Sequence, residues 1–480
     1  MSLTSLPYEL LDIIVESSLG PNFLDLAKTC KKIYARCEPF IRRHNVLRLR
    51  FRDFRYYARD RDYPVAASDL ISIIAADPIV VRYIKLADLV DDSRFLEYAR
   101  VRGAPPKSVP SIEEGGVIVQ LFAKSKYLQR AGLDWKEYYS MFSEDVREER
   151  YSQHGAAFLL TLLGDAESLT IPMSWEPNAA TNQLLNVLVT EARQPSSLSS
   201  GLRSVTTFCR YASRSVSENR GLSWASPFLA LPHLKSFESP GSFLVSGNPT
   251  SLAFRGSPYI AELLEAVDLD ACCIDAVGIT DFLKHAPRLK KLRYSHYTMR
   301  DFVPPDWDLC KFINAVAREA GSHLTELSVN IFKLRGTILP GKASTLGFQK
   351  LKKLEFPLML ATCNLNAAGV TGIMFTSIQR FFHVSVDPFV RDLIPTSVTH
   401  LSVKSDGMGP YDRGLDALFG NLGAVRRCQL PNLEEVFLNC KQGADEAYKQ
   451  QCNKIVADGK EEGVAVHLRC LDYARRVNWE

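Results

Sequence analysis

The hexapeptide Leu324-Thr-Glu-Leu327-Ser-Val329 carries apolar residues at its first, fourth and sixth positions, and this spacing returns along the chain. Alternation over its last three positions is typical of a β-strand with one buried face. The whole spacing is the strand signature of a leucine-rich repeat. The other clear copies begin at Leu264, Leu289, Leu351, Val398 and Leu433.

Helical runs precede several of these copies, at residues 279–285, 310–320 and 415–422. Consecutive parallel strands need a crossover connection, so this alternation predicts parallel strands joined by helices. Stacked units of this kind form a curved solenoid with the strands on its concave side. We therefore predict an α/β fold in which an irregular leucine-rich-repeat-like solenoid spans residues 46–480. A loop and helix insertion is expected near 91–151, and a C-terminal cap near 444–480.

Composition allows a large core, because 46% of the 480 residues are hydrophobic and 23% are charged. The net charge of +4 comes from 58 basic and 54 acidic residues, which argues against a protein built chiefly to bind nucleic acid or a membrane. The sequence lacks a run of eighteen apolar residues and the pattern of a secretory signal. We expect a soluble protein of the cytoplasm or nucleus.

The eleven cysteines are scattered and form no CxxC pair, which favours neither a disulfide framework nor a zinc site. The sequence also lacks the common phosphate-binding loops, the nucleophile elbow of hydrolases and the HExxH motif. We therefore predict no catalytic residues, no metal and no cofactor.

Three short helices are predicted in the first 45 residues. Pro7 suits the first turn of a helix, and the apolar residues from Leu10 to Val15 form a broad face on it. A second helix follows Asn22, and a third covers residues 31–37 before Pro39, which we expect to break it. Because a unit of this size buries little surface alone, we expect these helices to dock onto another domain or another protein.

The residues of these helices resemble the F-box motif over residues 5–41. The matching stretches are Leu6-Pro7-x-Glu9-Leu10-Leu11-x-x-Ile14 and Leu24-x-Leu26-Ala27-x-Thr29-Cys30-Lys31-Lys32-Ile33-Tyr34. Many members of the family have tryptophan where this chain has Ile33. In that family the three helices bind the Skp adaptor of an SCF ubiquitin ligase. The resemblance implies that the adaptor-binding residues are Leu6, Pro7, Leu10, Ile14, Leu24, Leu26, Ala27, Cys30, Ile33 and Tyr34.

The same resemblance, which is to F-box proteins common in fungi, implies a non-catalytic subunit. Such a protein holds a protein client near a ubiquitin-loaded enzyme, which is carried by the cullin and RING subunits behind the Skp adaptor. Client choice would come from side chains that point outward from the concave strands. The candidate client-binding residues are Asp268, Arg293, Ser328, Glu355, Ser402 and Phe437.

Two alternatives remain open. An F-box protein can act as a scaffold outside ubiquitin transfer. The segment from Arg42 to Arg61 mixes arginines with aromatic residues, a composition that also suits single-stranded nucleic acid. We favour a strand there, because Leu47, Leu49 and Phe51 alternate with arginines.

Overall fold

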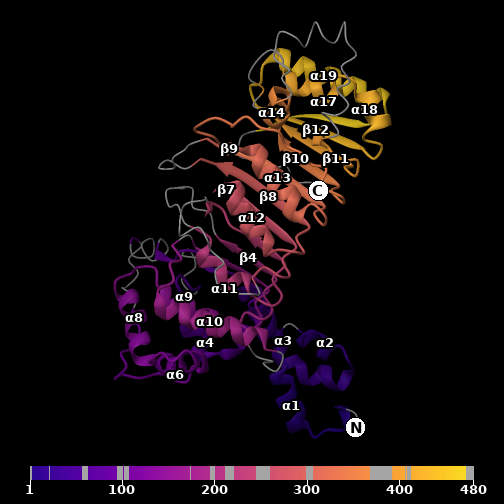
Figure 1. Ribbon diagram of the computed structural model, residues 1–480. Coiled ribbons are helices and arrows are strands. Elements are labelled where there is room, and N and C mark those ends of the chain that lie inside the picture. Colours follow the sequence, from indigo (N-terminus) through magenta and orange to yellow (C-terminus); the bar gives the residue numbers. More distant parts are fainter. Residues whose placement is uncertain are drawn as a thin grey trace, which may run out of the picture. The chain divides into compact units, whose positions relative to one another are not determined.

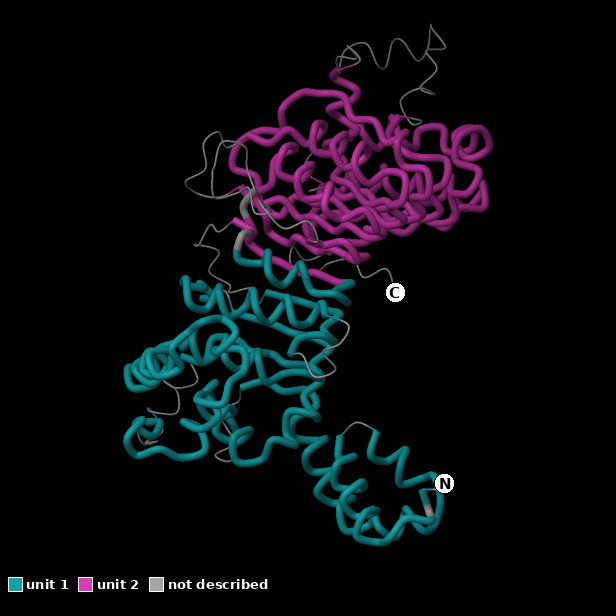
Figure 2. Tube along the Cα trace, turned by 60° about the horizontal axis from the view of Figure 1, so that its bottom comes forward, with its two compact units in different colours: residues 1–213, 224–235 teal, residues 214–223, 236–480 magenta. Residues whose placement is uncertain are grey.

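The computed structural model shows an α/β protein. It describes residues 3–20, 22–56, 63–93, 101, 108–172, 174–194, 201–210, 221–244, 260–298, 306–367, 392–405, 407 and 412–471. The chain forms two compact units (Figure 2). Unit 1 comprises residues 1–213 and 224–235, and unit 2 comprises residues 214–223 and 236–480.

Unit 1 begins with helices, as the sequence predicts. A 3-10 turn, η1 (Leu3–Ser5), precedes α1 (Tyr8–Ser17), α2 (Phe23–Ala27) and α3 (Lys31–Phe51). Pro7 is the N-cap residue of α1, and Glu9 lies in its first turn, where a carboxylate favours the helix dipole.

Parallel strands and further helices complete unit 1. They are β1 (Asp53–Arg55), α4 (Ala67–Ala76), η2 (Pro78–Tyr83), β2 (Leu86–Asp88), α6 (Val117–Ala123), α7 (Lys126–Arg130), α8 (Trp135–Arg147), α9 (Gln153–Leu160), β3 (Ser168–Ile171), α10 (Ala179–Arg193) and β4 (Thr207–Arg210). Another 3-10 turn, η3 (Ser223–Ala225), precedes α11 (Ser226–Leu229). Strands β1 to β4 pair in chain order, all parallel.

Unit 2 repeats a strand and helix alternation. Its elements are β5 (Ser236–Glu238), β6 (Phe243–Leu244), β7 (Ala266–Ile274), α12 (Ala276–Lys284), β8 (Lys291–Tyr297), α13 (Leu309–Ala320), β9 (Glu326–Lys333), β10 (Lys353–Pro357), α14 (Met359–Ala367), β11 (His400–Lys404), α17 (Arg413–Phe419), α18 (Leu422–Cys428), β12 (Glu435–Lys441), α19 (Glu446–Glu461) and β13 (Ala465–Leu471). The strand order is β5-β7-β8-β9-β10-β11-β12-β13, with β6 beside β7. The pairings among these described strands are all parallel, as predicted.

The repeated hexapeptide explains the register of this sheet. Each strand from β7 to β12 starts two residues after the first apolar residue of its copy, so the fourth position always falls in the same row. That row is Val267, Leu292, Leu327, Leu354, Leu401 and Val436, and each member is at most 2% exposed. The apolar spacing thus sets which strand residues face the core.

Helices cover this buried face. Figure 1 shows α12 and α13 lying along strands β7 to β9, and the ring of Tyr294 on β8 stacks on Phe312 of α13 at 4.5 Å. Helices α12, α13, α17, α18 and α19 each begin after an Asp or Asn whose side-chain oxygen accepts a hydrogen bond from a backbone N–H of the first turn.

Two local predictions are wrong. Residues 47–51 are not a strand, and Pro39 does not end the third helix, because α3 runs without a break from Lys31 to Phe51. The buried side chains of its second half are His44, Leu47 and Phe51, which recur at helical spacing, whereas Leu49 is exposed. Burial of this stripe offsets the cost of a proline inside a helix, which is about 3 kcal/mol.

Helix α19 and strand β13 lie within the range of the predicted C-terminal cap. Residues 472–480 of the predicted cap lie outside the described residues, as do 94–100 and 102–107 of the predicted insertion. Within the described part of that insertion, α6, α7 and α8 form. None of the helices in the described ranges is both long and apolar enough to cross a membrane.

Candidate partner-binding site

Helix α1 is apolar on two sides, and only one side is buried. Leu11 and Val15 are each 1% exposed, whereas Leu10 is 47% and Ile13 is 60% exposed. At about 100° of rotation per residue, Leu10, Ile13 and the half-buried Ile14 share one stripe that points away from Leu11 and Val15. We call this stripe the α1 surface.

The helices beneath the α1 surface have a small core of their own. Its buried members are Val15, Leu19, Phe23, Ala27, Ile33 and Cys37, and Leu24, Leu26 and Cys30 pack against them. The core therefore accounts for one side of α1, and leaves the apolar residues of the other side without a partner inside the described part of the chain.

Contacts with η2 hold this core in place. The ring of His44 on α3 lies 5.0 Å from that of Phe23, and its Nδ1 is 2.9 Å from the Tyr83 hydroxyl. Burial, with a smaller contribution from the charge of Arg48, lowers the pKa of His44. Arg82 donates to the carbonyl of Ser17 at 2.5 Å. Contacts with η2 thus hold the helices that carry the α1 surface in place.

Charged and aromatic side chains lie on the opposite side of α1 from the α1 surface, where α1 faces α3. The ring of Tyr8, which is more than half exposed, lies 5.0 Å from the Lys32 ammonium and 5.2 Å from the Arg36 guanidinium. Arg36 also forms an ion pair with Asp12. The exposed apolar residues of the α1 surface, rather than these paired side chains, are typical of a protein-binding surface.

The predicted adaptor-binding residues fall into three groups. Pro7, Leu10 and Tyr34 are exposed, and Ala27 and Ile33 are buried in the core of the helices. The others are half-buried, namely Leu6, Ile14, Leu24, Leu26 and Cys30. The predicted set leaves out the exposed Ile13, although Ile13 follows Leu10 at helical spacing and could have been recognised from it.

None of the six predicted client-binding residues is exposed, and four of them are buried. The expectation that they point into solvent is wrong for those four. Asp268 and Arg293 are half-buried. The buried ones are Ser328, Glu355, Ser402 and Phe437. The four are neighbours on successive strands, where side chains in one row are close enough to contact each other.

Hydrogen bonds and ring contacts join this row to the next one. Glu355 accepts a hydrogen bond from Nδ2 of Asn330 at 2.7 Å, and Ser402 Oγ accepts one from Nδ2 of Asn439 at 2.7 Å. The Arg469 guanidinium lies 3.8 Å from the centre of the Phe437 ring. We call Ser328, Glu355 and Ser402 the polar row of β9 to β11.

Glu355 is the charged member of the polar row. Burial raises the pKa of its carboxyl, and the hydrogen bond from Asn330 and the charges of Lys404 and Arg293 oppose that rise. Ionisation of the Glu355 carboxyl is therefore unfavourable within the sheet of unit 2.

Three aromatic rings of the segment from Arg42 to Arg61 are buried. Phe51, Phe54 and Tyr56 are each at most 2% exposed, so their rings cannot stack on bases without unfolding. Arg43 forms an ion pair with Asp77 at 2.8 Å. Residues 57–62 lie outside the described residues.

The adjacent Cys272 and Cys273 are both buried. In the described ranges, no group of three His, Cys, Asp or Glu residues is arranged to hold a metal ion.

No protein-family model matches this chain, and no curated protein matches it at a significant level.

Proposed function

We propose that the chain is an F-box adaptor that binds a Skp adaptor through its N-terminal helices and a protein client through unit 2. The observation that carries the proposal is the α1 surface, because Leu10 and Ile13 stay in solvent while Leu11 and Val15 fill the core. These exposed residues lie inside the stretch whose sequence resembles the F-box motif.

The energetics of such a surface suit a tight complex. Burying one exposed leucine or isoleucine contributes about 1.5–3 kcal/mol. The two residues together would then contribute about 3–6 kcal/mol, or roughly a hundredfold to ten-thousandfold in affinity, since each 1.4 kcal/mol is about tenfold.

The repeated strands support the second half of the proposal. Their parallel stacking and the apolar spacing that sets their register are what a leucine-rich-repeat-like solenoid requires, and such repeats expose long surfaces to partners. The protein would then act by proximity, because it holds the client at high effective concentration near the transferring enzyme.

The test is an affinity measurement between the full chain and a purified Skp adaptor. The double variant Leu10→Asp, Ile13→Asp should weaken binding by at least about 100-fold, since it places two charges in the buried part of the interface. Leu49→Asp is the matched control, because Leu49 is 89% exposed on α3 and lies outside the F-box resemblance. The control should bind within about threefold of wild type.

Absence of binding by a folded wild-type chain would refute the adaptor proposal. Equal losses in the control and the double variant would show that the α1 surface is not the interface. Reconstituted ubiquitin transfer to co-purifying proteins then separates a ligase subunit from a scaffold that acts outside ubiquitin transfer.

A further inference from the structure

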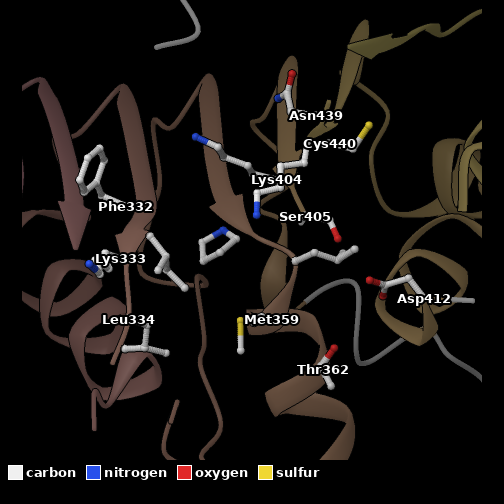
Figure 3. A pocket seen from close by; sticks show the side chains of 14 residues that line it. Phe332, Lys333, Leu334, Met359, Thr362, Lys404, Ser405, Asp412, Asn439 and Cys440 are labelled. Carbon is white, nitrogen blue, oxygen red and sulfur yellow. The ribbon is translucent and has the colours of Figure 1, made fainter. Parts of the chain in front are cut away.

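Unit 2 contains a pocket at the carboxyl ends of strands β9 to β12. Its volume is about 550 Å³, which is within the range of sites that bind small molecules or single peptide side chains. Phe332, Lys333 and Leu334 line one side, and Asp412 lines the other (Figure 3). Ligands of open parallel sheets commonly bind outside the carboxyl ends of the strands.

Three lysines give the pocket a positive charge. Lys333, Lys404 and Lys441 come from the ends of β9, β11 and β12. In the described part of the chain, the ammonium groups of Lys333 and Lys404 make no ion pair. The acid in the lining, Asp412, accepts hydrogen bonds from the N–H groups of Gly414 and Leu415. The pocket thus favours an anionic group.

Asn439 adds an independent sign of a missing partner. It lines the pocket and is 1% exposed, and its Nδ2 donates to Ser402. Its Oδ1 is buried and has no hydrogen-bond partner among the described residues. A buried acceptor left unpaired costs about 1–3 kcal/mol, so a ligand that brings an N–H or O–H donor would be favoured here.

An exposed apolar ledge completes the pocket. Phe332 is 45% and Met359 is 48% exposed, and Leu334, Pro357 and Leu358 lie beside them. In Figure 3, Met359 lies below the strand ends that carry Lys404 and Ser405. A flexible methionine adapts well to an apolar side chain.

We infer that this pocket binds an acidic peptide segment that carries an apolar side chain. The peptide carboxylate would pair with Lys333 and Lys404, its apolar side chain would pack on Phe332 and Met359, and a backbone N–H would donate to Asn439. A peptide supplies all three chemistries within a few residues, whereas a simple inorganic anion supplies only the first. The inference rests on the proposed function, since it names the kind of client segment that unit 2 recognises.

The test uses the full chain and a fluorescently labelled pool of nine-residue peptides in which Asp or Glu alternates with Leu, Phe or Met. A second pool replaces the acids with lysine. Binding is followed by anisotropy at two salt concentrations. The acidic pool should bind, more weakly at the higher salt, and the basic pool should not.

Two variants locate the binding. The double variant Lys333→Gln, Lys404→Gln should weaken binding of the acidic pool by at least about tenfold. A loss of this size is expected when each lysine contributes one ion pair that is exposed or half-buried. Lys284→Gln, Lys350→Gln is the matched control, since it removes the same charge from two exposed positions of unit 2 outside the pocket lining. The control should bind within about twofold of wild type.

Several outcomes would overturn the inference: no binding of the acidic pool, equal losses in both double variants, or full competition by a single-stranded oligonucleotide or by inorganic phosphate. Binding to the Skp adaptor is measured on the same preparations. Intact adaptor binding without peptide binding refutes the pocket alone, and peptide binding without adaptor binding refutes the F-box role and leaves an acidic-peptide site.

Discussion

Helix α1 leaves Leu10 and Ile13 in solvent, whereas strands β9 to β11 bury Ser328, Glu355 and Ser402. Both regions depart from the rule that apolar side chains lie inside and polar ones outside, and they depart in opposite directions. The α1 surface lacks an internal partner, which suggests an external one. The polar row has found its partners on neighbouring strands, so it contributes to the sheet and is not free to bind a client.

The largest effect should separate the two sides of α1. Leu11→Ala removes a fully buried side chain and should lower the free energy of unfolding of the N-terminal helices by about 3 kcal/mol. Ile13→Ala should change it by less than about 0.5 kcal/mol, because that side chain is mostly in solvent. Hydrogen exchange of the amides of α1 to α3 measures both. Similar losses in the two variants would mean that Ile13 packs within the chain.

A second prediction concerns a buried polar side chain of β8. His296 lies between the Tyr294 hydroxyl, at 2.8 Å from its Nδ1, and the Thr298 hydroxyl, at 3.3 Å from its Nε2, and it stacks on Trp307 at 4.0 Å. Burial lowers its pKa to about 3. Above pH 6.5 the ring is neutral in the folded and unfolded chain. As the pH falls below 6.5, only the unfolded chain gains the proton, so stability is lost between about pH 6.5 and 3.

At pH 5 this loss should reach about 2 kcal/mol relative to pH 7. Urea unfolding of wild type and His296→Gln between pH 5 and 8 measures it. The variant, which cannot take up that proton, should show a smaller dependence on pH than wild type. An identical dependence in the two proteins would show that His296 is not held neutral.

The smallest effect tests the polar row. Because burial raises the pKa of Glu355, stability that is present while the carboxyl is protonated is lost as the pH rises through its folded pKa. Glu355→Gln keeps an acceptor for Asn330 and removes the charge. It should raise the free energy of unfolding at pH 8 by on the order of 1 kcal/mol.

Glu326→Gln is the control for this change. Glu326 is the first residue of β9 and forms an ion pair with Lys291 of β8 at 3.0 Å. Loss of that ion pair should destabilise unit 2 by about 0–1 kcal/mol. A destabilising Glu355→Gln would instead mean that the ionised carboxylate holds the polar row together.

The hexapeptide spacing made the sheet of unit 2 predictable, because each copy contains both the strand and the face that it buries. Two features were not predictable in this way. The strand interpretation of residues 47–51 relied on alternation over a short stretch, and the helical spacing of His44, Leu47 and Phe51 across a longer one decided the outcome. The outward positions of the strands were expected to be solvated. They are buried by contacts with residues of neighbouring strands, such as Ser402 and Asn330 around Glu355, which lie 47 and 25 positions away in the chain. The pattern within a single strand does not encode those contacts.

The continuous helix α3 has a consequence for the geometry of any complex. Its first turns belong to the core of the N-terminal helices through Ile33 and Cys37, and its last turns carry Leu47 and Phe51. Its 21 residues span about 31 Å at 1.5 Å per residue, with no loop at residue 45. The helix is therefore a rigid spacer inside unit 1. Each residue inserted into α3 would rotate the α1 surface by about 100° around the axis of α3 and shift it by about 1.5 Å along that axis.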